Sequence, residues 1–483
     1  MAPTKAECDQ LSSLFKAGQP AELESRTRSL LERHPDSGFA WNTLGVSLQM
    51  QGKDSLLALQ KAAEFLPNDA DVHYNLGNAI KALNRLDDAE TSYRRALQIR
   101  PSFASAHYNL GDTLKDLGRL NEAELSFRQA LEIKPDFFKA HNNLGNILKE
   151  LGRFNEARVC FLRVLEIKPD FADAQWNLGL VLLTLGQFQR GWQEYEMRWN
   201  REEAKSLPKT PYPCWLGNEN IVGKKLLIQF EQGLGDAIQM LRYIPLLEQK
   251  NIECWIQIPD SLHRLVARSF PHSKVIEPYT CPEGLDYRVP TMSLPLAMQT
   301  FSEQSIPRSA SYLIPDDDRC SFWQKQLAST RPRTVGLVWR GNPRHTNDHN
   351  RSASLIDLLP LIAAYESIQF VTMQKDLTDA ERNTLKNYNN TRILDDELTD
   401  FDETTAVMCN MDVVISVDSA PAHLSGALGR STWILLPFGG EWRWMVDRTD
   451  SPWYPSAKLF RQKSIGNWAE VVDNVKMSLT KFG

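Results

Sequence analysis

The sequence predicts a multidomain protein in which an all-helical repeat array precedes a pair of α/β domains. Three observations support this fold class. Glycines recur 34 residues apart and their surroundings repeat with the same period, at Gly77, Gly111, Gly145 and Gly179. After about residue 222, short apolar runs rich in β-forming residues alternate with longer helical segments, as in parallel sheets covered by helices. A linker-like stretch over 305–332 divides that region into two similar halves.

Each repeat carries the residues of a helical hairpin. The glycine follows a leucine in the first helix, where a small residue allows the second helix to approach closely. After Gly77, Gly111 and Gly145 an alanine follows at twelve residues, then an aromatic residue, and finally a proline that ends the second helix, whereas the unit of Gly179 has bulkier residues in place of later small ones. This period identifies a tetratricopeptide superhelix, whose units bury their apolar faces by stacking on their neighbours. We expect the array to span 1–204.

An asparagine precedes the Leu-Gly pair of each well-formed repeat, at Asn75, Asn109, Asn143 and Asn177. An amide side chain both donates and accepts hydrogen bonds, so a row of amides can hold an extended peptide by its backbone. The array here resembles the asparagine ladder of the O-linked N-acetylglucosamine transferases, which implies that these residues bind a polypeptide acceptor. The alternative is that the asparagines cap or link neighbouring helices.

The composition excludes several functional classes. A net charge of -5 and a pI near 6.1 give no general electrostatic reason to bind nucleic acid or an anionic membrane. No apolar run is long enough for a membrane span, and the first ten residues lack the apolar stretch of a secretory signal. The seven cysteines are scattered and never in C-x-x-C spacing, which predicts reduced thiols in a cytoplasmic protein without a zinc site.

Six apolar runs in the second region predict buried parallel strands, at 224–231, 253–259, 333–341, 368–374, 411–418 and 431–437. Prolines and glycines break the helical period near 200–222, where the array ends. We expect two Rossmann-like domains, 205–325 and 326–483, that face each other across a cleft.

The first of these domains begins with a glycine-containing loop. The first strand leads into Gln232-Gly233-Leu234-Gly235-Asp236 and then a helix. Glycines here let the backbone approach a ligand, and the helix N-terminus supplies free amides. The third glycine of a dinucleotide fingerprint is absent, with Ile238 near its place, which disfavours an NAD site. Asp236 is a candidate catalytic residue, a helix cap, or both.

The second domain offers a similar arrangement near its end. The strand over 411–418 brings Asp418 to the carboxyl end of the sheet, where ligands of open α/β sheets bind. Ser419 and Ala420 then open a helix whose amides can hold a diphosphate. Asp418 can accept hydrogen bonds from sugar hydroxyls. His423 either donates to a phosphate or is a packed helix residue.

From about 220 to 465 the chain resembles glycosyltransferase family 9, the heptosyltransferase-like branch of the GT-B fold, in the form that bacteria fuse to tetratricopeptide repeats. Three segments carry the resemblance: GLGDAIQMLRYIPLL, GLVWRGNPRHTNDHNRS and VDSAPAHLSGALGRSTWILLP. The WRW segment at 442–444 and the WYP segment at 453–455 are similar to the repeat-fused branch rather than to the lipopolysaccharide enzymes.

The resemblance implies roles for individual residues. Asp236 matches the aspartate proposed as general base, and Arg351 matches the basic residue that holds the donor phosphate. Asp418, Ser419 and His423 match the element that binds the donor sugar and diphosphate, with Ala420 where the family often has glycine. Gly233 and Gly235 complete the donor-binding candidates.

These residues predict a metal-independent, inverting transfer from a nucleotide-sugar co-substrate, with no cofactor, because fixed positive groups neutralise the leaving phosphate. The acceptor is predicted to be a Ser or Thr hydroxyl of a polypeptide bound by the array, and the resemblance implies flagellin or another surface-protein subunit. Two alternatives remain open: a glycan or lipid-linked acceptor, and a non-enzymatic adaptor with a degenerate GT-B region.

Other polar groups are weaker candidates. Asp400-Phe401-Asp402 matches a D-x-D metal motif but is also typical of a helix entry. His345 and His349 lie in a charged loop with no evident third ligand. Trp339, Trp442 and Trp444 either wall a base or sugar site or belong to the core, and we expect at least two of them to be core residues.

Overall fold

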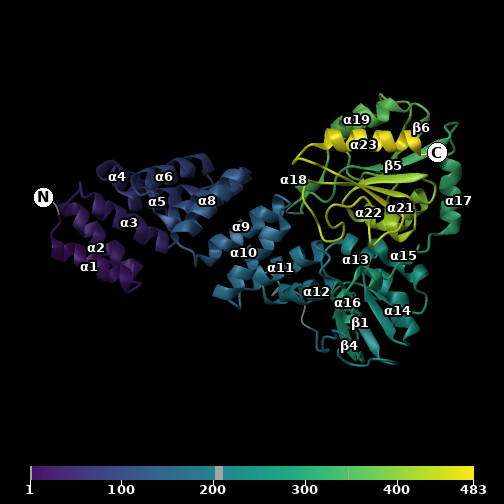
Figure 1. Ribbon diagram of the computed structural model, residues 1–483, viewed down its shortest axis with the longest axis horizontal. Coiled ribbons are helices and arrows are strands. Elements are labelled where there is room, and N and C mark those ends of the chain that lie inside the picture. The colour runs from purple at the N-terminus through teal and green to yellow at the C-terminus, as the bar shows by residue number, and fades with distance from the viewer. Residues whose placement is uncertain (1–2, 202–209, 346, 483) are drawn as a thin grey trace. The chain divides into compact units, whose positions relative to one another are not determined.

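The computed structural model describes residues 3–201, 210–345 and 347–482 (Figure 1). The predicted boundary between 204 and 205 lies outside the described residues. The chain divides into two compact units between Ala174 and Gln175, within helix α11 (Ala172–Thr184). Each unit is described by itself.

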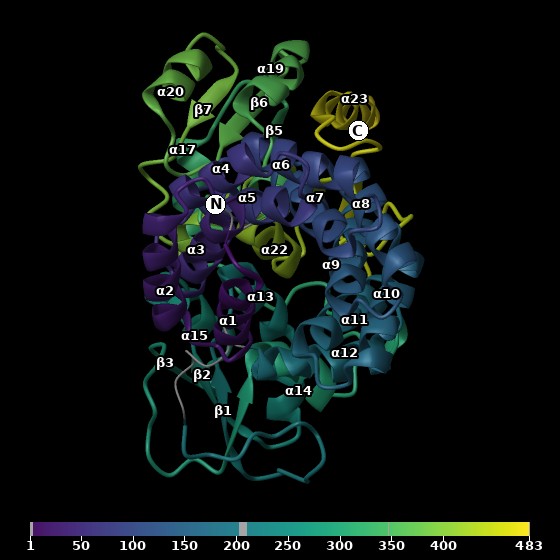
Figure 2. The same cartoon turned by 90° about the vertical axis from the view of Figure 1, so that its left-hand side faces the viewer.

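The first unit is a series of antiparallel helix pairs. Its helices are α1 (Lys5–Lys16), α2 (Pro20–Arg33), α3 (Gly38–Met50), α4 (Leu56–Phe65), α5 (Ala70–Ala82), α6 (Leu86–Ile99), α7 (Ala104–Asp116), α8 (Leu120–Ile133), α9 (Phe138–Glu150) and α10 (Phe154–Ile167). Figure 2 shows the pairs from α3 to α10 following one another along a curved path. The predicted helical array is confirmed.

The repeated glycines have the packing role that their spacing predicts. A Cβ on Gly77 would lie 2.7 Å from the ring of Tyr93, because that aromatic side chain of the second helix fills the space. Gly111 has the same relationship with Phe127, at 2.9 Å. Each aromatic ring is fully buried, so the glycine and its aromatic partner together set the distance between the two helices of a repeat.

The second unit contains two parallel sheets. The first sheet has the strand order β3-β2-β1-β4, with β1 (Lys225–Gln229), β2 (Glu253–Gln257), β3 (Lys274–Ile276) and β4 (Tyr287–Pro290). The second has the order β10-β9-β8-β5-β6-β7, with β5 (Arg333–Val338), β6 (Ile368–Thr372), β7 (Thr391–Ile393), β8 (Val413–Val417), β9 (Thr432–Leu436) and β10 (Ala457–Arg461). We call the regions around these sheets the first and second lobes.

Helices surround both sheets. After α11 come α12 (Phe188–Tyr195), the 3₁₀ turn η1 (Glu196–Asn200), α13 (Leu234–Met240), η3 (Leu241–Tyr243), α14 (Ile244–Gln249), α15 (Asp260–Ser269), η4 (Thr291–Ser293), α16 (Leu294–Ala297) and η5 (Glu303–Ser305). The second lobe adds α17 (Asp317–Gln326), α18 (Asp348–Arg351), α19 (Leu355–Ala364), α20 (Asp379–Leu385), α21 (Phe401–Met408), α22 (Ala420–Ala427) and α23 (Trp468–Lys481). The predicted tetratricopeptide array followed by two parallel α/β regions is thus the observed architecture, and it is consistent with a GT-B pair.

All six predicted strands are present, but four others were not predicted. β3 and β7 have only three residues each and include exposed positions, so they lack the continuous apolar run of a buried strand. β4 and β10 mix polar with apolar residues. The stretch interpreted as a linker over 305–332 contains helix α17, whose Trp323 is buried. These misses share one cause, which is that short or mixed segments carry little periodicity.

The two lobes share one apolar core. One face of the six-stranded sheet carries α19 and α23, and the opposite face carries α21 and α22 (Figure 1). Helices α21 and α22 also contact α15 and α13 of the first lobe. The buried cluster around them is continuous from Ile228 in the first sheet to Val414 in the second. Packing of this extent fixes the lobes relative to each other.

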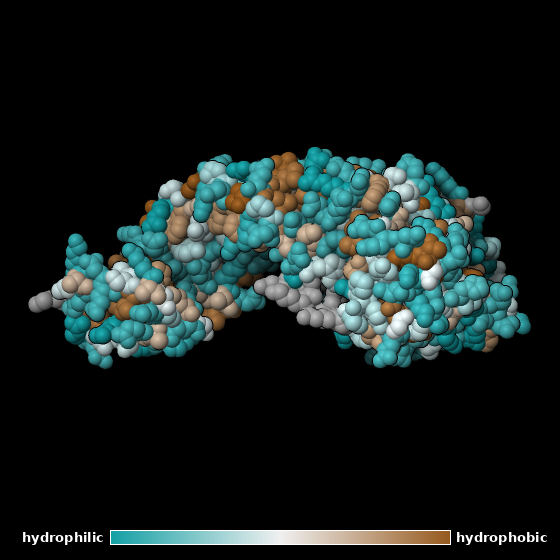
Figure 3. Space-filling view, turned by 90° about the horizontal axis from the view of Figure 1, so that it is seen from below, coloured by the Kyte–Doolittle hydropathy of each residue, from teal (hydrophilic) through white to brown (hydrophobic). Residues whose placement is uncertain are grey.

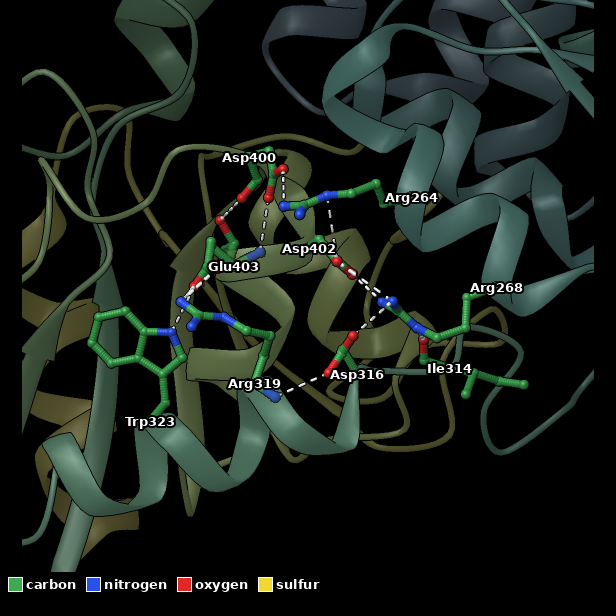
Figure 4. A network of polar contacts seen from close by, with 10 residues as sticks. Arg264, Arg268, Ile314, Asp316, Arg319, Trp323, Asp400, Asp402 and Glu403 are labelled. Carbon is green, nitrogen blue, oxygen red and sulfur yellow. Dashed lines mark hydrogen bonds and ion pairs between the residues drawn. The ribbon is translucent and has the colours of Figure 1, made fainter.

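A polar network joins the lobes beside this core (Figure 4). Arg264 on α15 pairs with Asp400 at 2.5 Å, and Arg268 pairs with Asp402 at the start of α21. Asp400 also caps α21, because its carboxylate accepts the Glu403 N–H at 2.9 Å. The D-x-D motif is therefore a helix entry that bonds to the first lobe.

Helix α17 joins the same network. Arg319 and the indole N–H of Trp323 both donate to Glu403, at 2.8 and 2.7 Å. Burial opposes ionisation of Glu403, but these two donors lower its pKa below the ordinary value. The carboxylate is consequently ionised and holds α17 against α21.

The surface gives no sign of a large apolar patch on the face drawn in Figure 3, where hydrophilic side chains dominate and apolar ones stand in small groups. Among the described residues, no helix has both the length and the hydropathy needed to cross a bilayer.

Candidate functional site

Asp236 lies in the first turn of α13, directly behind the carboxyl end of β1. Its Oδ2 accepts the N–H of Gly233, the residue that precedes the helix, at 2.9 Å. This is the capping role that sequence analysis left open, and it fixes the rotation of the carboxylate. The side chain remains 17% exposed, so capping does not bury it.

The second oxygen of Asp236 meets a cation from the other lobe. Arg443, in the loop after β9, forms an ion pair with Asp236 Oδ1 and a second one with Glu441. Its Nε also donates to Gln239 Oε1 of α13 at 2.9 Å. Sequence analysis did not assign Arg443 a role. The sequence feature that could have indicated such a role is the position of this charged residue between Trp442 and Trp444, two tryptophans that are buried in the structure.

The two predicted loops meet where α13 packs on α22. A Cβ on Gly235 would lie 2.7 Å from His423 Cδ2 and 3.5 Å from Ala420 Cα. The glycine therefore allows the helix tips to touch, and a side chain there would separate them. The structure brings Gly233, Gly235 and Asp236 together with Ala420 and His423 of the second lobe.

His423 is 4% exposed and held on three sides. Its Nδ1 lies 2.9 Å from the Tyr454 hydroxyl, its Nε2 lies 3.8 Å from Asp418 Oδ1, and its ring stacks on Trp444. Burial lowers the pKa of His423 well below its usual value, and the nearby arginines Arg443, Arg242 and Arg351 reinforce this shift. His423 is therefore a neutral imidazole that is both packed and adjacent to Asp418.

The start of α22 has fewer free backbone N–H donors than we expected from the sequence. Ser419 is the N-cap, and its hydroxyl donates to the Val417 carbonyl at 3.2 Å. Pro421 occupies the first turn and has no N–H, while the Ala422 N–H donates to the Ser419 carbonyl at 3.0 Å. Neutralisation of an anion here would depend mainly on arginine side chains.

Arg351 supplies one such side chain at the end of α18. Its Nε lies 3.3 Å from Asp348 Oδ1. Its guanidinium packs against Gly341, because a Cβ built on that glycine would lie only 2.7 Å from Arg351 Nη2. The pKa of His345 is lowered below its ordinary value, first by desolvation and then by the positive charge of Arg351. The negative charges of Asp418 and Asp236 oppose this shift. Arg351 and His345 thus lie within electrostatic range of the two carboxylates.

The loop that carries Arg443 is held by Arg461 of β10, which donates to the carbonyls of Gly439 and Met445 at 2.5 and 2.8 Å. Burial raises the pKa of Glu441 to about 7, opposed by Arg443 and reinforced by Asp418 and Asp236. The site therefore combines three carboxylates, Asp236, Asp418 and Glu441, with several arginines.

The three tryptophans are core residues. Trp339, Trp442 and Trp444 are 0, 2 and 0% exposed. Trp339 donates its indole N–H to Glu381 at 3.2 Å, and Trp444 supports the ring of His423. The expectation that at least two of them are buried is confirmed.

The asparagine ladder lies mostly in the first unit, where the amide groups link neighbouring helices. Asn75 donates to Asn42 Oδ1 at 3.0 Å, Asn109 to Asn78 Oδ1 at 2.7 Å, and Asn143 to Asp112 Oδ1 at 3.3 Å. Asn177, in the second unit, is 5% exposed. The helix-linking alternative is thus realised for three of them, and a role in acceptor binding remains a prediction.

Candidate metal ligands do not converge in the part of the chain that the structure describes, where no three His, Cys, Asp or Glu side chains are placed to share an ion. His345 Nδ1 accepts the Asn347 N–H at 3.1 Å. Asp400 and Asp402 are engaged with Arg264 and Arg268.

Comparisons with known proteins support the architecture. A family model described as TPR repeat matches residues 78–118, 111–152 and 145–186. Protein FlbA of Caulobacter vibrioides is 26% identical over 319 residues, which are 60% of this chain and 52% of that protein. The chain thus spans about half the length of this curated relative. The chain carries tetratricopeptide repeats followed by an α/β region of parallel sheets, and it is distantly similar to FlbA.

Solved structures match the helical part. MamA is 22% identical with a TM-score of 0.31, and the match covers 34% of this chain and 96% of that one. YrrB, titled a TPR protein with an unusual peptide-binding site, is 20% identical with a TM-score of 0.33, over 38% of this chain and 98% of that one. PilW, titled a type IV pilus biogenesis factor, is 17% identical with a TM-score of 0.39, over 42% and 99%.

Proposed function

We propose that this protein is a glycosyltransferase that moves a sugar from a nucleotide-sugar to Ser or Thr hydroxyls of a polypeptide recruited by the repeat array. The observation that carries the proposal is the junction at the start of α13, where Asp236 pairs with Arg443 of the second lobe and Gly235 lies against His423, whose Nε2 is 3.8 Å from Asp418 Oδ1. A carboxylate from one lobe beside cations and a helix tip from the other suits displacement of an anionic leaving group.

The donor is assigned to the second lobe. The neutral His423 lies on α22, which follows the carboxyl end of β8, and the charges of Arg351 and Arg443 act on it, which favours a diphosphate there. Asp418 would accept hydrogen bonds from sugar hydroxyls. Arg351 and Arg443 supply positive charge without a metal ion.

Asp236 is assigned the role of general base. It would take the proton of the acceptor hydroxyl as the oxygen attacks the anomeric carbon, while the bond from that carbon to the diphosphate breaks and the nucleoside diphosphate leaves. A single displacement of this kind inverts the anomeric centre. The Gly233 and Arg443 contacts hold the carboxylate in one orientation, and a carboxylate has further lone pairs for the hydroxyl.

The repeat array is assigned the binding of the polypeptide acceptor. Tetratricopeptide superhelices present extended surfaces suited to polypeptides, and amide side chains recur along this one. Flagellin or another surface-protein subunit is the acceptor class implied by the repeat-fused family. Transfer to a lipid-linked glycan and a non-enzymatic adaptor role are the alternatives that the experiment separates.

The test has two parts. A panel of nucleotides and nucleotide-sugars is screened by thermal shift, since a ligand at a hundred times its Kd stabilises the native state by about 2.7 kcal/mol. The stabilising donor is then incubated with candidate acceptors, using the full chain and a chain lacking residues 1–174. Loss of polypeptide transfer with retained donor binding in the truncated chain supports the proposal. Transfer to a glycan alone, or no stabilising donor, contradicts it.

A further inference from the structure

We infer that helix α12 and turn η1, the last repeat-type segment of the chain, are a positioning element of the site rather than only the end of the array. They contact the loop before Asp236 through Tyr195 and Arg198, and they pack behind the loop of Arg443 through Trp192. The inference deepens the proposed function and rests on it, because it names what holds both halves of that site in place.

Tyr195 holds Gln232, the residue of the first loop with the most constrained backbone conformation. Gln232 has φ of 61°, a left-handed conformation that L residues rarely adopt. Its amide Nε2 donates to the Tyr195 hydroxyl at 2.7 Å. Gly233 follows immediately and donates to Asp236. The tyrosine hydroxyl thus fixes the backbone turn from which the catalytic carboxylate is oriented.

Arg198 anchors the preceding residue. Its guanidinium bonds Glu231 through Nε at 3.2 Å and Nη2 at 2.9 Å, and Nη2 also donates to the Ser293 hydroxyl at 2.7 Å. Arg198 and Glu231 are 7 and 5% exposed. Two consecutive residues of the loop, Glu231 and Gln232, therefore have their side chains held by the segment from α12 to η1.

Trp192 reaches the opposite side of the site. Its ring meets Trp442 edge to face with centroids 5.1 Å apart, and its indole N–H donates to the Thr300 carbonyl at 3.0 Å. Trp442 directly precedes Arg443, and the Arg443 guanidinium lies over the Trp442 ring at 4.1 Å. One helix thus touches the supports of both members of the Asp236 and Arg443 pair.

The position of Tyr195 is aromatic in the three earlier repeats, once with a hydroxyl, at Tyr93, and twice without one. Tyr195 lies 34 residues after Phe161, at the position where each repeat places an aromatic ring against its glycine. Gly179 differs from the earlier glycines, because a Cβ there would meet the Tyr195 backbone nitrogen, at 2.7 Å, rather than an aromatic ring. Phenylalanine fills the position in two earlier repeats, at Phe127 and Phe161.

The test is Tyr195→Phe, which keeps the ring and removes only the acceptor of the Gln232 amide. The matched control is Tyr365→Phe, which removes a hydroxyl that donates to the Lys476 carbonyl at 2.6 Å, on the far side of the second sheet. We expect Tyr195→Phe to lower kcat about tenfold with the donor KM within about twofold of wild type, because the base is misplaced rather than lost. Tyr365→Phe should leave both constants unchanged.

A second readout does not depend on transfer. Hydrogen exchange of the backbone amides from 232 to 236 should be faster in Tyr195→Phe than in wild type or Tyr365→Phe, with an unchanged melting temperature. Unchanged exchange and unchanged kcat would overturn the positioning role while the transferase stands. Faster exchange in a protein whose wild type transfers no sugar to any acceptor would overturn the proposed function while the positioning contact stands.

Discussion

The Asp236 carboxylate and the Arg443 guanidinium form an ion pair although the two residues are 207 positions apart and belong to different lobes. Their side chains are 17 and 13% exposed, so the pair is largely screened from water. The pair gives the proposed base a fixed orientation and gives the junction of the lobes a polar contact at its centre.

Replacing Arg443 should damage both functions of this pair. We expect Arg443→Ala to lower kcat about a hundredfold, because the base loses its orientation and the site a cation. Stability should fall by about 2 kcal/mol, the usual effect of removing a charged hydrogen-bond partner from a mostly buried group. Urea unfolding and initial rates measure the two effects. Wild-type kcat in Arg443→Ala would show that the pair is irrelevant to transfer.

Gly235→Ala should separate the tips of α13 and α22. The new methyl group would lie 2.7 Å from His423 Cδ2, in a contact between two packed helices. We expect destabilisation of about 1–3 kcal/mol together with weaker donor binding. Gly233→Ala is the comparison, since its methyl group meets only Asp236 Oδ2, at 3.3 Å. Equal stability of the two variants by calorimetry would contradict the account of the helix contact.

The buried pair of Arg198 and Glu231 should be sensitive to loss of one partner. Arg198→Met keeps much of the apolar stem but leaves the Glu231 carboxyl without its cation, which should cost about 3–5 kcal/mol. Arg163→Met removes the partner of Glu166 in an exposed pair and should cost at most about 0.5 kcal/mol. Denaturant midpoints of the two variants compare them directly, and similar midpoints would refute the buried role.

The pH dependence of stability has two contributions of opposite sign. The pKa of Glu441 is raised to about 7, so the folded state holds a proton that the unfolded state has lost above about 4.5, and this stabilisation disappears as pH rises through 7. The pKa of His423 is lowered, so the unfolded state binds the extra proton and stability falls as pH drops below 6.5.

Glu441→Gln separates these contributions because it leaves His423 in place. We expect the melting temperature of wild type relative to Glu441→Gln to decrease as pH is raised from about 5 to 8, since only wild type has a carboxyl at position 441 that must lose its proton. A thermal-melt series in matched buffers measures this difference. A difference independent of pH would contradict the raised pKa of Glu441.

The asparagines of the array give a test of acceptor recruitment. Asn109→Ala and Asn143→Ala each remove amide donors that link neighbouring helices, so each should lower the stability of the array by about 1 kcal/mol. The proposed ladder adds a second effect, which is a loss of polypeptide affinity beyond that expected from unfolding. Titration of the acceptor well below the melting transition, with donor binding as the control, separates the two effects.

Sequence reasoning recovered the elements with strong periodicity. The 34-residue repeat predicted the helix pairs and the role of Gly77, and the long apolar runs predicted β1, β2, β5, β6, β8 and β9. It did not find β7 or α17, because three residues or a polar helix carry too little pattern.

The site residues that belong to local motifs could be predicted from the sequence. Asp236, Gly235 and His423 were singled out from their places at helix starts, and the structure brings them together. Arg443, Tyr195 and Arg198 were missed as site neighbours because their relation to Asp236 depends on tertiary packing between segments far apart in the chain. A single sequence without relatives contains no signal for such pairs.

The most direct test of the central claim is Asp236→Asn, with donor binding measured by calorimetry and transfer measured by mass spectrometry of the acceptor polypeptide. The substitution keeps a side-chain oxygen for the Gly233 N–H, and it removes the basicity of the carboxylate together with the negative charge that pairs with Arg443. The account predicts donor affinity within about twofold of wild type and kcat reduced by about 10²–10⁴. Transfer at the wild-type rate by Asp236→Asn would contradict it.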